Sequence, residues 1–385
     1  MSETQEAQSA STSLVLHVWP AQWELPSIDP QCIAAVIYMQ LTFPGRYSIV
    51  ECSDPDQSPS GQLPFLTHEH NEVSPLPSII AYLDSLSRSE SHSINAPVDA
   101  GLKPPQAQRS TIWKAYATSQ LGDLLAHQMF VEHYWTFTHG ALAKLMPLPQ
   151  RLYVPGRLRK MHQPRLEAIG MWDAHFIEEP ETLKPAIKTP EKPKASSTQV
   201  YKHAFAKERL LERARTAFGL LSNLLQTDEF IHGDSPTSLD ITIASHILPL
   251  LYIPFPNPVL SSELRTSFPE LASHADRVLE YSRTAPSAPT LPAPTVRSSI
   301  STVINSWRRD ANVFAQEKEK GPRAEKEASL RYGKWAFALL AGVGSIVYLL
   351  ATGIVSISMG DAEEEVEIEV TQDMLDSLVE DEDVE

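Results

Sequence analysis

The sequence predicts a mixed α/β domain, then an all-α domain, then a single C-terminal membrane-spanning helix. Three features indicate this order: short apolar runs of strand length near the N-terminus, leucine-rich segments at helical spacing in the middle, and a long uncharged segment near the C-terminus. The chain has 385 residues, of which 42% are hydrophobic, so it can form two or three packed domains.

The α/β domain is expected to span residues 14–88. In chain order we expect a strand at 14–19, a helix carrying the apolar residues from Ile33 to Leu41, strands at 47–52 and 65–68, and a helix beginning near Ile79. Asp29 or Ser27 can cap the first helix, because either side chain accepts a hydrogen bond from a first-turn N–H. This order predicts a small mixed sheet with helices packed on it.

The all-α domain is expected over residues 105–282, interrupted by a Pro- and Lys-rich loop at 180–199. Within it, Thr237 and Asp240 form an S/T-x-x-D pair, in which the carboxylate reaches back to the start of a helix. Such a pair contributes roughly 1–2 kcal/mol to helix stability. We therefore interpret Asp240 as a structural cap and not as a catalytic acid.

The C-terminal third is expected to attach the chain to a membrane. A Pro-rich linker at 283–299 and a charged juxtamembrane segment at 300–334 precede the uncharged run of 25 residues from Trp335 to Met359. At ~1.5 Å per residue this run reaches ~37 Å, which is enough to cross a ~30 Å hydrocarbon core. We expect a transmembrane helix whose ends are Trp335 and Met359.

The charge of the chain is divided along its length. Of 48 acidic residues, 13 lie in the segment 361–385, which leaves 35 acidic against 32 basic residues in the rest of the chain. The positive-inside rule then predicts a cytosolic folded part and an acidic tail, 360–385, across the membrane. The tail can be a solvated, disordered segment or a docking segment for basic or β-strand partners. A body without excess positive charge disfavours nucleic-acid binding.

The remaining residues of chemical interest are few. Residues 1–13 contain no basic residue and no apolar run, so we expect a disordered N-terminus without a targeting signal. The two cysteines, Cys32 and Cys52, are too few for a disulfide framework. His68 and His70 lack the further ligands that a metal site needs, so neither a metal nor another cofactor is expected.

A basic cluster occupies residues 151–165. We interpret it mainly as a solvated loop and helix face, with contact to anionic lipid or to a partner subunit as the alternative. The interaction residues expected on the second interpretation are Arg157, Arg159 and Lys160.

The predicted architecture resembles the glutathione-transferase fold, with a thioredoxin-like first domain and a helical second domain. Leu63-Pro64 stands where that fold has a cis-proline, and the segment 230–241 matches its helical-domain signature. The resemblance implies a Glu/Gln-Ser pair for the γ-glutamyl group, but Pro75 and Leu76 stand there instead. Ser27 and Cys32 are the only nearby candidates for binding a thiolate, and Cys32 lies within an apolar helix run, where we expect it to pack. Because the γ-glutamyl donors are also missing, we expect no enzyme activity.

A narrower resemblance is to the metaxin family. It rests on Trp19, Trp23, the segment 25–34 and the segment 233–240, together with the C-terminal anchor. The fungal metaxin-like subunit of the mitochondrial sorting and assembly machinery has this combination. The resemblance implies an outer-membrane subunit that helps β-barrel precursors to insert, assemble and leave the machinery.

The partners implied by this resemblance are a β-barrel core subunit, sister subunits, precursor proteins and the lipid bilayer. It also places the folded domain in the cytosol and the acidic tail in the intermembrane space. Trp19 and Trp23 are the interaction residues expected in the first loop. Two alternatives remain: a tail-anchored transferase relative of the ganglioside-induced differentiation type, acting in organelle dynamics or thiol chemistry, and the same topology in the endoplasmic reticulum.

Overall fold

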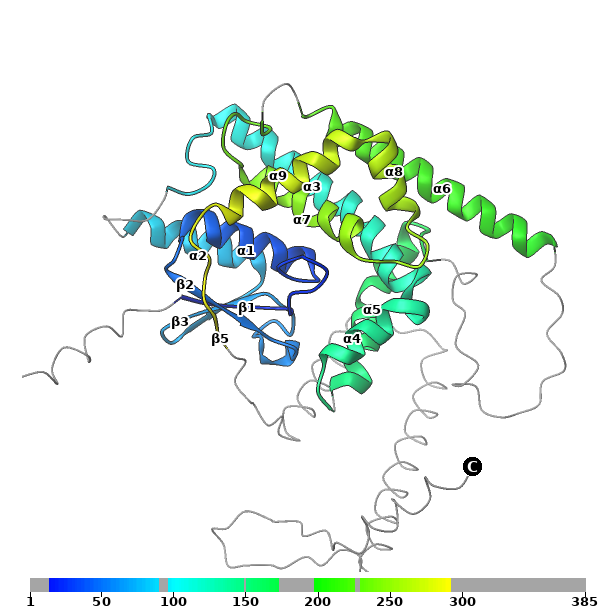
Figure 1. Cartoon of the computed structure of the whole chain (residues 1–385), viewed down its shortest axis with the longest axis horizontal. Coiled ribbons are helices and arrows are strands. Elements are labelled where there is room, and N and C mark those ends of the chain that lie inside the picture. The colour runs from blue at the N-terminus through cyan, green and yellow to red at the C-terminus, as the bar shows by residue number, and fades with distance from the viewer. Residues whose placement is uncertain (1–13, 90–95, 149, 173–196, 226–228, 292–385) are drawn as a thin grey trace, which may run out of the picture. The chain divides into compact units, whose positions relative to one another are not determined.

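The computed structural model describes residues 14–89, 96–148, 150–172, 197–225 and 229–291, all within one compact unit that ends by residue 302 (Figure 1). The predicted disordered N-terminus (1–13), juxtamembrane segment (300–334), transmembrane helix (335–359) and acidic tail (360–385) lie outside the described residues. Within the described ranges, no helix is both long and apolar enough to cross a membrane.

The N-terminal part contains a five-stranded mixed sheet. Its elements are β1 (Leu14–Val18), α1 (Pro30–Thr42), β2 (Tyr47–Glu51), η1 (Pro55–Gln57), β3 (Phe65–His68), β4 (Asn71–Val73) and α2 (Leu76–Ser89). The strand order is β4-β3-β1-β2-β5. β1 pairs in parallel with β2 through the crossover helix α1 and antiparallel with β3, and β3 and β4 form an antiparallel hairpin.

Helix α1 begins at Pro30 because Asp29 caps it, accepting a hydrogen bond from the backbone N–H of Cys32 at 3.0 Å. Its residues are apolar almost all round, and most of them are buried. α1 therefore lies between the sheet and the helical part, where it packs against α7 and α9 (Figure 1).

The helical part follows α2 directly. Its elements are α3 (Pro104–His127), the π-helical segments η2 (Gln128–Glu132) and η3 (Tyr134–Thr138), α4 (His139–Leu145), α5 (Gln150–Ala168), α6 (Ser197–Ser222), α7 (Ser238–Tyr252), α8 (Val259–Ser267) and α9 (Pro269–Arg283). The almost wholly buried α7 packs against α1, α3 and α9. One continuous hydrophobic core therefore joins the two parts.

Two predicted boundaries differ from the structure. The loop expected over 180–199 ends earlier, because no proline follows Pro193 and α6 begins at Ser197. The expected linker 283–299 is partly folded: Arg283 belongs to α9, and β5 (Thr290–Leu291) pairs in parallel with β2. The outer edge of β2 has backbone N–H groups that need acceptors, and the segment at β5 supplies them.

Candidate functional site

The first loop and the helical part enclose a cavity of about 610 Å³. Its walls come from the β1–α1 loop, the start of α1 and helices α3, α5 and α7, and this is the position at which the resemblance placed a thiol site. Apolar walls are supplied by Trp19, Ile28, Leu125, Met129, Phe130 and Leu158. A space of this size and character is large enough for a small ligand or a partner's side chains.

Most ionisable groups that line this cavity are paired or held neutral. Asp123 is almost fully buried, and its carboxylate accepts hydrogen bonds from the Arg165 guanidinium and lies 3.6 Å from that of Arg213. Burial lowers the pKa of His162 to about 4, so its ring is neutral at physiological pH and stacks on Phe130. Most polar groups of the cavity are therefore engaged with its walls, and the Asp29 carboxyl likewise accepts a hydrogen bond from the backbone N–H of Cys32.

The two candidates for thiol chemistry are Ser27 and Cys32, and both side chains are fully buried. Burial, and next the nearby Asp29 carboxyl, raise the pKa of the Cys32 thiol well above its ordinary value. A thiol in this state is a poor nucleophile and a poor metal ligand, because both roles need the thiolate.

The start of α2 is the other place where a glutathione site would need hydrogen-bond donors. Leu76 is the first residue of that helix and follows Pro75, whose own peptide bond to Ser74 is cis. Proline has no N–H and leucine has no hydroxyl, so neither supplies the donors that the resemblance requires. Among the described residues, no group of three or more His, Cys, Asp or Glu side chains could hold a metal ion.

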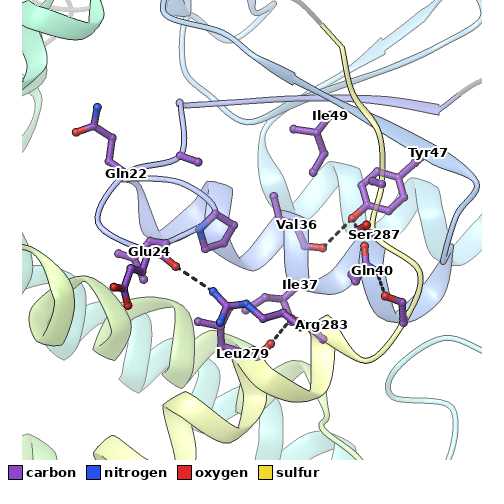
Figure 2. Close-up of a pocket in the computed structure, with 16 residues that line it drawn as sticks. Gln22, Glu24, Val36, Ile37, Gln40, Tyr47, Ile49, Leu279, Arg283 and Ser287 are labelled. Atoms are coloured by element: carbon purple, nitrogen blue, oxygen red, sulfur yellow. Dashed lines mark hydrogen bonds between the residues drawn. The ribbon is translucent and has the colours of Figure 1, made fainter.

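A second cavity, of about 500 Å³, lies between the first loop, α1, β2 and the end of α9, and Figure 2 shows the residues that line it. Here the chain after α9 crosses the helix on its way to β5. The side-chain amide of Gln40 donates to the carbonyls of Ala285 (3.1 Å) and Pro286 (2.6 Å), and the Tyr47 hydroxyl donates to Gln40 at 2.7 Å. Arg283 donates to the carbonyl of Glu24 at 3.0 Å. The sequence analysis did not predict these hydrogen bonds to the segment after α9, because nothing local to Gln40 indicates a partner that lies 246 residues away.

The residues predicted to have structural roles are Pro64, Thr237 and Asp240. The Leu63-Pro64 peptide bond is cis. The Asp240 carboxylate accepts hydrogen bonds from the backbone N–H and the hydroxyl of Thr237, at 2.8 and 2.6 Å, and from the N–H of Ile231 at 3.0 Å. His274 Nε2 lies 2.8 Å from the same carboxylate, and both side chains are fully buried. The sequence signal for His274 is a polar residue in the buried stripe of α9, between Leu271 and Val278.

The predicted interaction residues are distributed differently than expected. Trp19 belongs to the core, while Trp23 is half-buried and its ring lies 5.6 Å from that of Phe137. Arg157 is buried and forms a 2.6 Å ion pair with Asp56. Lys160 is exposed.

Arg159 also makes its contacts within the fold. Its Nε donates to the carbonyl of Phe130 at 3.0 Å, and its guanidinium lies over the rings of Tyr134, Trp135 and Trp172. The interpretation of Arg157 and Arg159 as surface contacts is therefore corrected: aromatic and carboxylate partners on neighbouring elements draw both side chains into the fold. The predicted anchor ends, Trp335 and Met359, lie outside the described residues.

Comparison with known proteins gives two family matches. Residues 32–159 match the family described as "Outer mitochondrial membrane transport complex protein", and residues 214–278 match the family "Glutathione S-transferase, C-terminal domain". Metaxin-1 of Macaca fascicularis is 26% identical over 346 residues, which cover 89% of this chain and 91% of that protein. Most of the chain is therefore similar to metaxins.

Other similar proteins extend the comparison. Metaxin-1 of Homo sapiens is 26% identical over 92% of this chain, and the match covers 64% of the human protein. A glutathione S-transferase from Ceriporiopsis subvermispora, solved with glutathione, has a TM-score of 0.43 and 14% identity over 70% of this chain and 97% of its own. The match of residues 214–278 and the mixed sheet with its helical part support a glutathione-transferase-like fold for this chain.

Proposed function

We propose that this metaxin-like chain is a non-enzymatic subunit of a transport and sorting complex in the mitochondrial outer membrane. The observation that carries the proposal is the match of residues 32–159, which run from α1 into α5, to a family described by that membrane and that role. Within such a complex, the chain would aid the insertion, assembly and release of β-barrel precursors through protein–protein contacts.

The chemistry of the first loop and of the start of α2 supports a role without catalysis. The buried Cys32 thiol has a raised pKa, and Pro75 and Leu76 lack the donors that would hold a γ-glutamyl group. A glutathione-transferase-like body that has lost these groups still offers a rigid scaffold with two cavities. Its partners would be a β-barrel core subunit, sister subunits of the same complex and the precursors themselves.

The proposed topology rests on the sequence beyond residue 291. The uncharged segment 335–359 would cross the outer membrane, with the folded domain in the cytosol and the acidic tail 360–385 in the intermembrane space. Protease added to intact mitochondria should digest the folded domain and spare an antibody tag placed after Glu385. A tag that is lost together with the folded domain would contradict this orientation.

The proposal is tested by purifying the tagged full-length chain from mitochondria in mild detergent. We expect recovery of an outer-membrane β-barrel core subunit with it. A chain lacking residues 361–385 serves as a comparison, since loss of the partners from that variant alone would assign the contact to the acidic tail. Absence of a β-barrel subunit from the full-length preparation would overturn the proposed function.

The match of residues 214–278 to a glutathione S-transferase domain favours a second candidate, a tail-anchored transferase-like protein of organelle dynamics or thiol chemistry. Retention on immobilised glutathione, abolished by Ser27→Ala, would support this candidate. We expect no retention, because Ser27 and Cys32 are fully buried. Glu72→Ala, an exposed change on β4, controls for non-specific effects.

A further inference from the structure

The turn between α4 and α5 exposes two leucines. Leu148 and Leu152 are 66% and 77% exposed and lie four residues apart, across the start of α5. The turn is already helical there, because the N–H of Arg151 donates to the carbonyl of Pro147 at 3.0 Å. Residues four apart on a helix share a face, so the two leucines form one small apolar patch. We call Lys144, Leu148, Arg151 and Leu152 the α4–α5 tip.

Positive charge borders this patch. Lys144, in the last turn of α4, is exposed, and so is Arg151, whose Nε donates to the carbonyls of Ala143 (2.8 Å) and Met146 (3.3 Å). The sequence from His133 to Leu166 contains no Asp or Glu. The tip therefore combines apolar side chains with cations, which is the composition of segments that lie on anionic membrane surfaces.

The base of the tip is held rigidly against the sheet. Gln150 donates to Asp54 at 3.0 Å, Tyr153 donates to Asp56 at 2.7 Å, and Arg157 forms its ion pair with Asp56. These contacts pair the nearby carboxylates of the loop after β2 with α5. Among the described residues of the tip, Lys144 and Arg151 remain exposed, and the contacts attach the helix that carries Leu152 to the loop after β2.

We propose that the α4–α5 tip docks on an anionic lipid surface, with Leu148 and Leu152 entering the headgroup region and Lys144 and Arg151 contacting lipid phosphates. This inference rests on the proposed attachment to a membrane and adds a second contact to it. Figure 1 shows α4 and β5 on the same, lower side of the folded unit in that view. Charge complementarity favours lipid over an apolar protein surface as the occupant.

The experiment uses the full-length chain reconstituted into vesicles of phosphatidylcholine with or without phosphatidylserine. A fluorophore is attached to Leu148→Cys or Leu152→Cys, and quenching by spin-labelled lipids is measured. Labelling is selective, because Cys32 and Cys52 are both buried. Ile112→Cys on α3 is the matched control, since Ile112 is 70% exposed.

We expect strong quenching at 148 and 152 in vesicles with phosphatidylserine, and little at 112. Lys144→Gln should weaken the affinity of the tip for the phosphatidylserine-containing surface by about fivefold, which is the loss expected for one cation at an anionic surface. Lys103→Gln, just before α3, should leave that affinity unchanged. Equal quenching at 148 and 112 in vesicles that hold the chain would overturn this inference and leave the proposed function standing. Protection of the labels only after mitochondrial subunits are added would assign the tip to a protein and would also overturn it.

Discussion

At the scale of single residues, the fold depends on a few buried polar side chains. The Asp240 carboxylate contacts Thr237 at its own helix start and two residues beyond it, Ile231 and His274, and so joins the loop at Ile231 and helix α9 to α7. Burial alone would raise the pKa of Asp240, but the hydrogen bond and charge of His274 and the bond from Thr237 outweigh it and lower that pKa. The ionised carboxylate is therefore the form that stabilises the fold.

The first prediction concerns Asp240→Asn. This change replaces a carboxylate, whose two oxygens accept hydrogen bonds, with an amide that has one accepting oxygen and one donating NH2 group. We expect a loss of ~3–5 kcal/mol in the free energy of unfolding, measured by urea denaturation near pH 7. Since the folded pKa is lowered, the contribution of Asp240 is present above about pH 4 and disappears as pH falls through the folded pKa, so the difference between the two proteins should shrink in acid. Asp234→Asn, an exposed change in the same loop, should be nearly neutral.

The second prediction concerns Asp29, the N-cap of α1. Burial raises its pKa to about 6, although the N–H of Cys32 acts in the opposite direction. A raised folded pKa means that its contribution to stability is complete below about pH 4 and is lost as pH rises through about 6. Asparagine caps equally well and does not titrate.

Asp29→Asn should therefore raise the free energy of unfolding by ~1–2 kcal/mol at pH 7.5, with little gain near pH 4. Denaturation curves at the two pH values measure this difference. The exposed Glu72→Gln supplies the control. A gain that is the same at both pH values would contradict the titration of Asp29.

At the scale of elements, α5 is attached to the sheet through the loop that contains η1. Arg157 and Asp56 form a buried ion pair, and the Tyr153 hydroxyl donates to the same carboxylate. These contacts join residues that lie about a hundred positions apart in the chain. They position the α4–α5 tip relative to the sheet.

The third prediction follows from this attachment. Arg157→Ala leaves Asp56 buried without its cation, so we expect a loss of ~3–5 kcal/mol in the free energy of unfolding. Lys160→Ala, three residues further along α5 and exposed, should change stability by less than ~0.5 kcal/mol. Chemical denaturation followed by tryptophan fluorescence compares the two variants, and equal stabilities would contradict the structural role assigned to Arg157.

At the scale of the whole molecule, the segment after α9 returns to the first part of the chain. Gln40 holds the carbonyls of Ala285 and Pro286, and the N–H of Ile49 donates to the carbonyl of Pro289 at 3.0 Å. The sheet therefore gains β5 as its edge strand, and the exit point of the chain becomes part of the folded unit.

The fourth prediction tests whether Gln40 holds the segment after α9 against the first part of the chain. Gln40→Ala removes both side-chain donors, so we expect faster hydrogen exchange at the Ile49 amide and earlier proteolysis within 285–291. The remaining amides of β1 and α7 should keep their protection. Gln31→Ala, an exposed change on the same helix, is the control and should leave exchange at Ile49 unchanged.

The sequence by itself determined the α/β-then-α order, the Thr237–Asp240 cap and the uneven distribution of charge, and it narrowed the cap of α1 to Ser27 or Asp29. Each depends on side chains within a few residues of one another, where spacing and capping preference act directly. Only the tertiary structure decided that Trp19 and Arg157 are buried, that His274 completes the Asp240 site and that 290–291 join the sheet. These contacts join residues 34 to 246 positions apart, and such pairs are selected by the packing of the whole chain and not by local sequence preference.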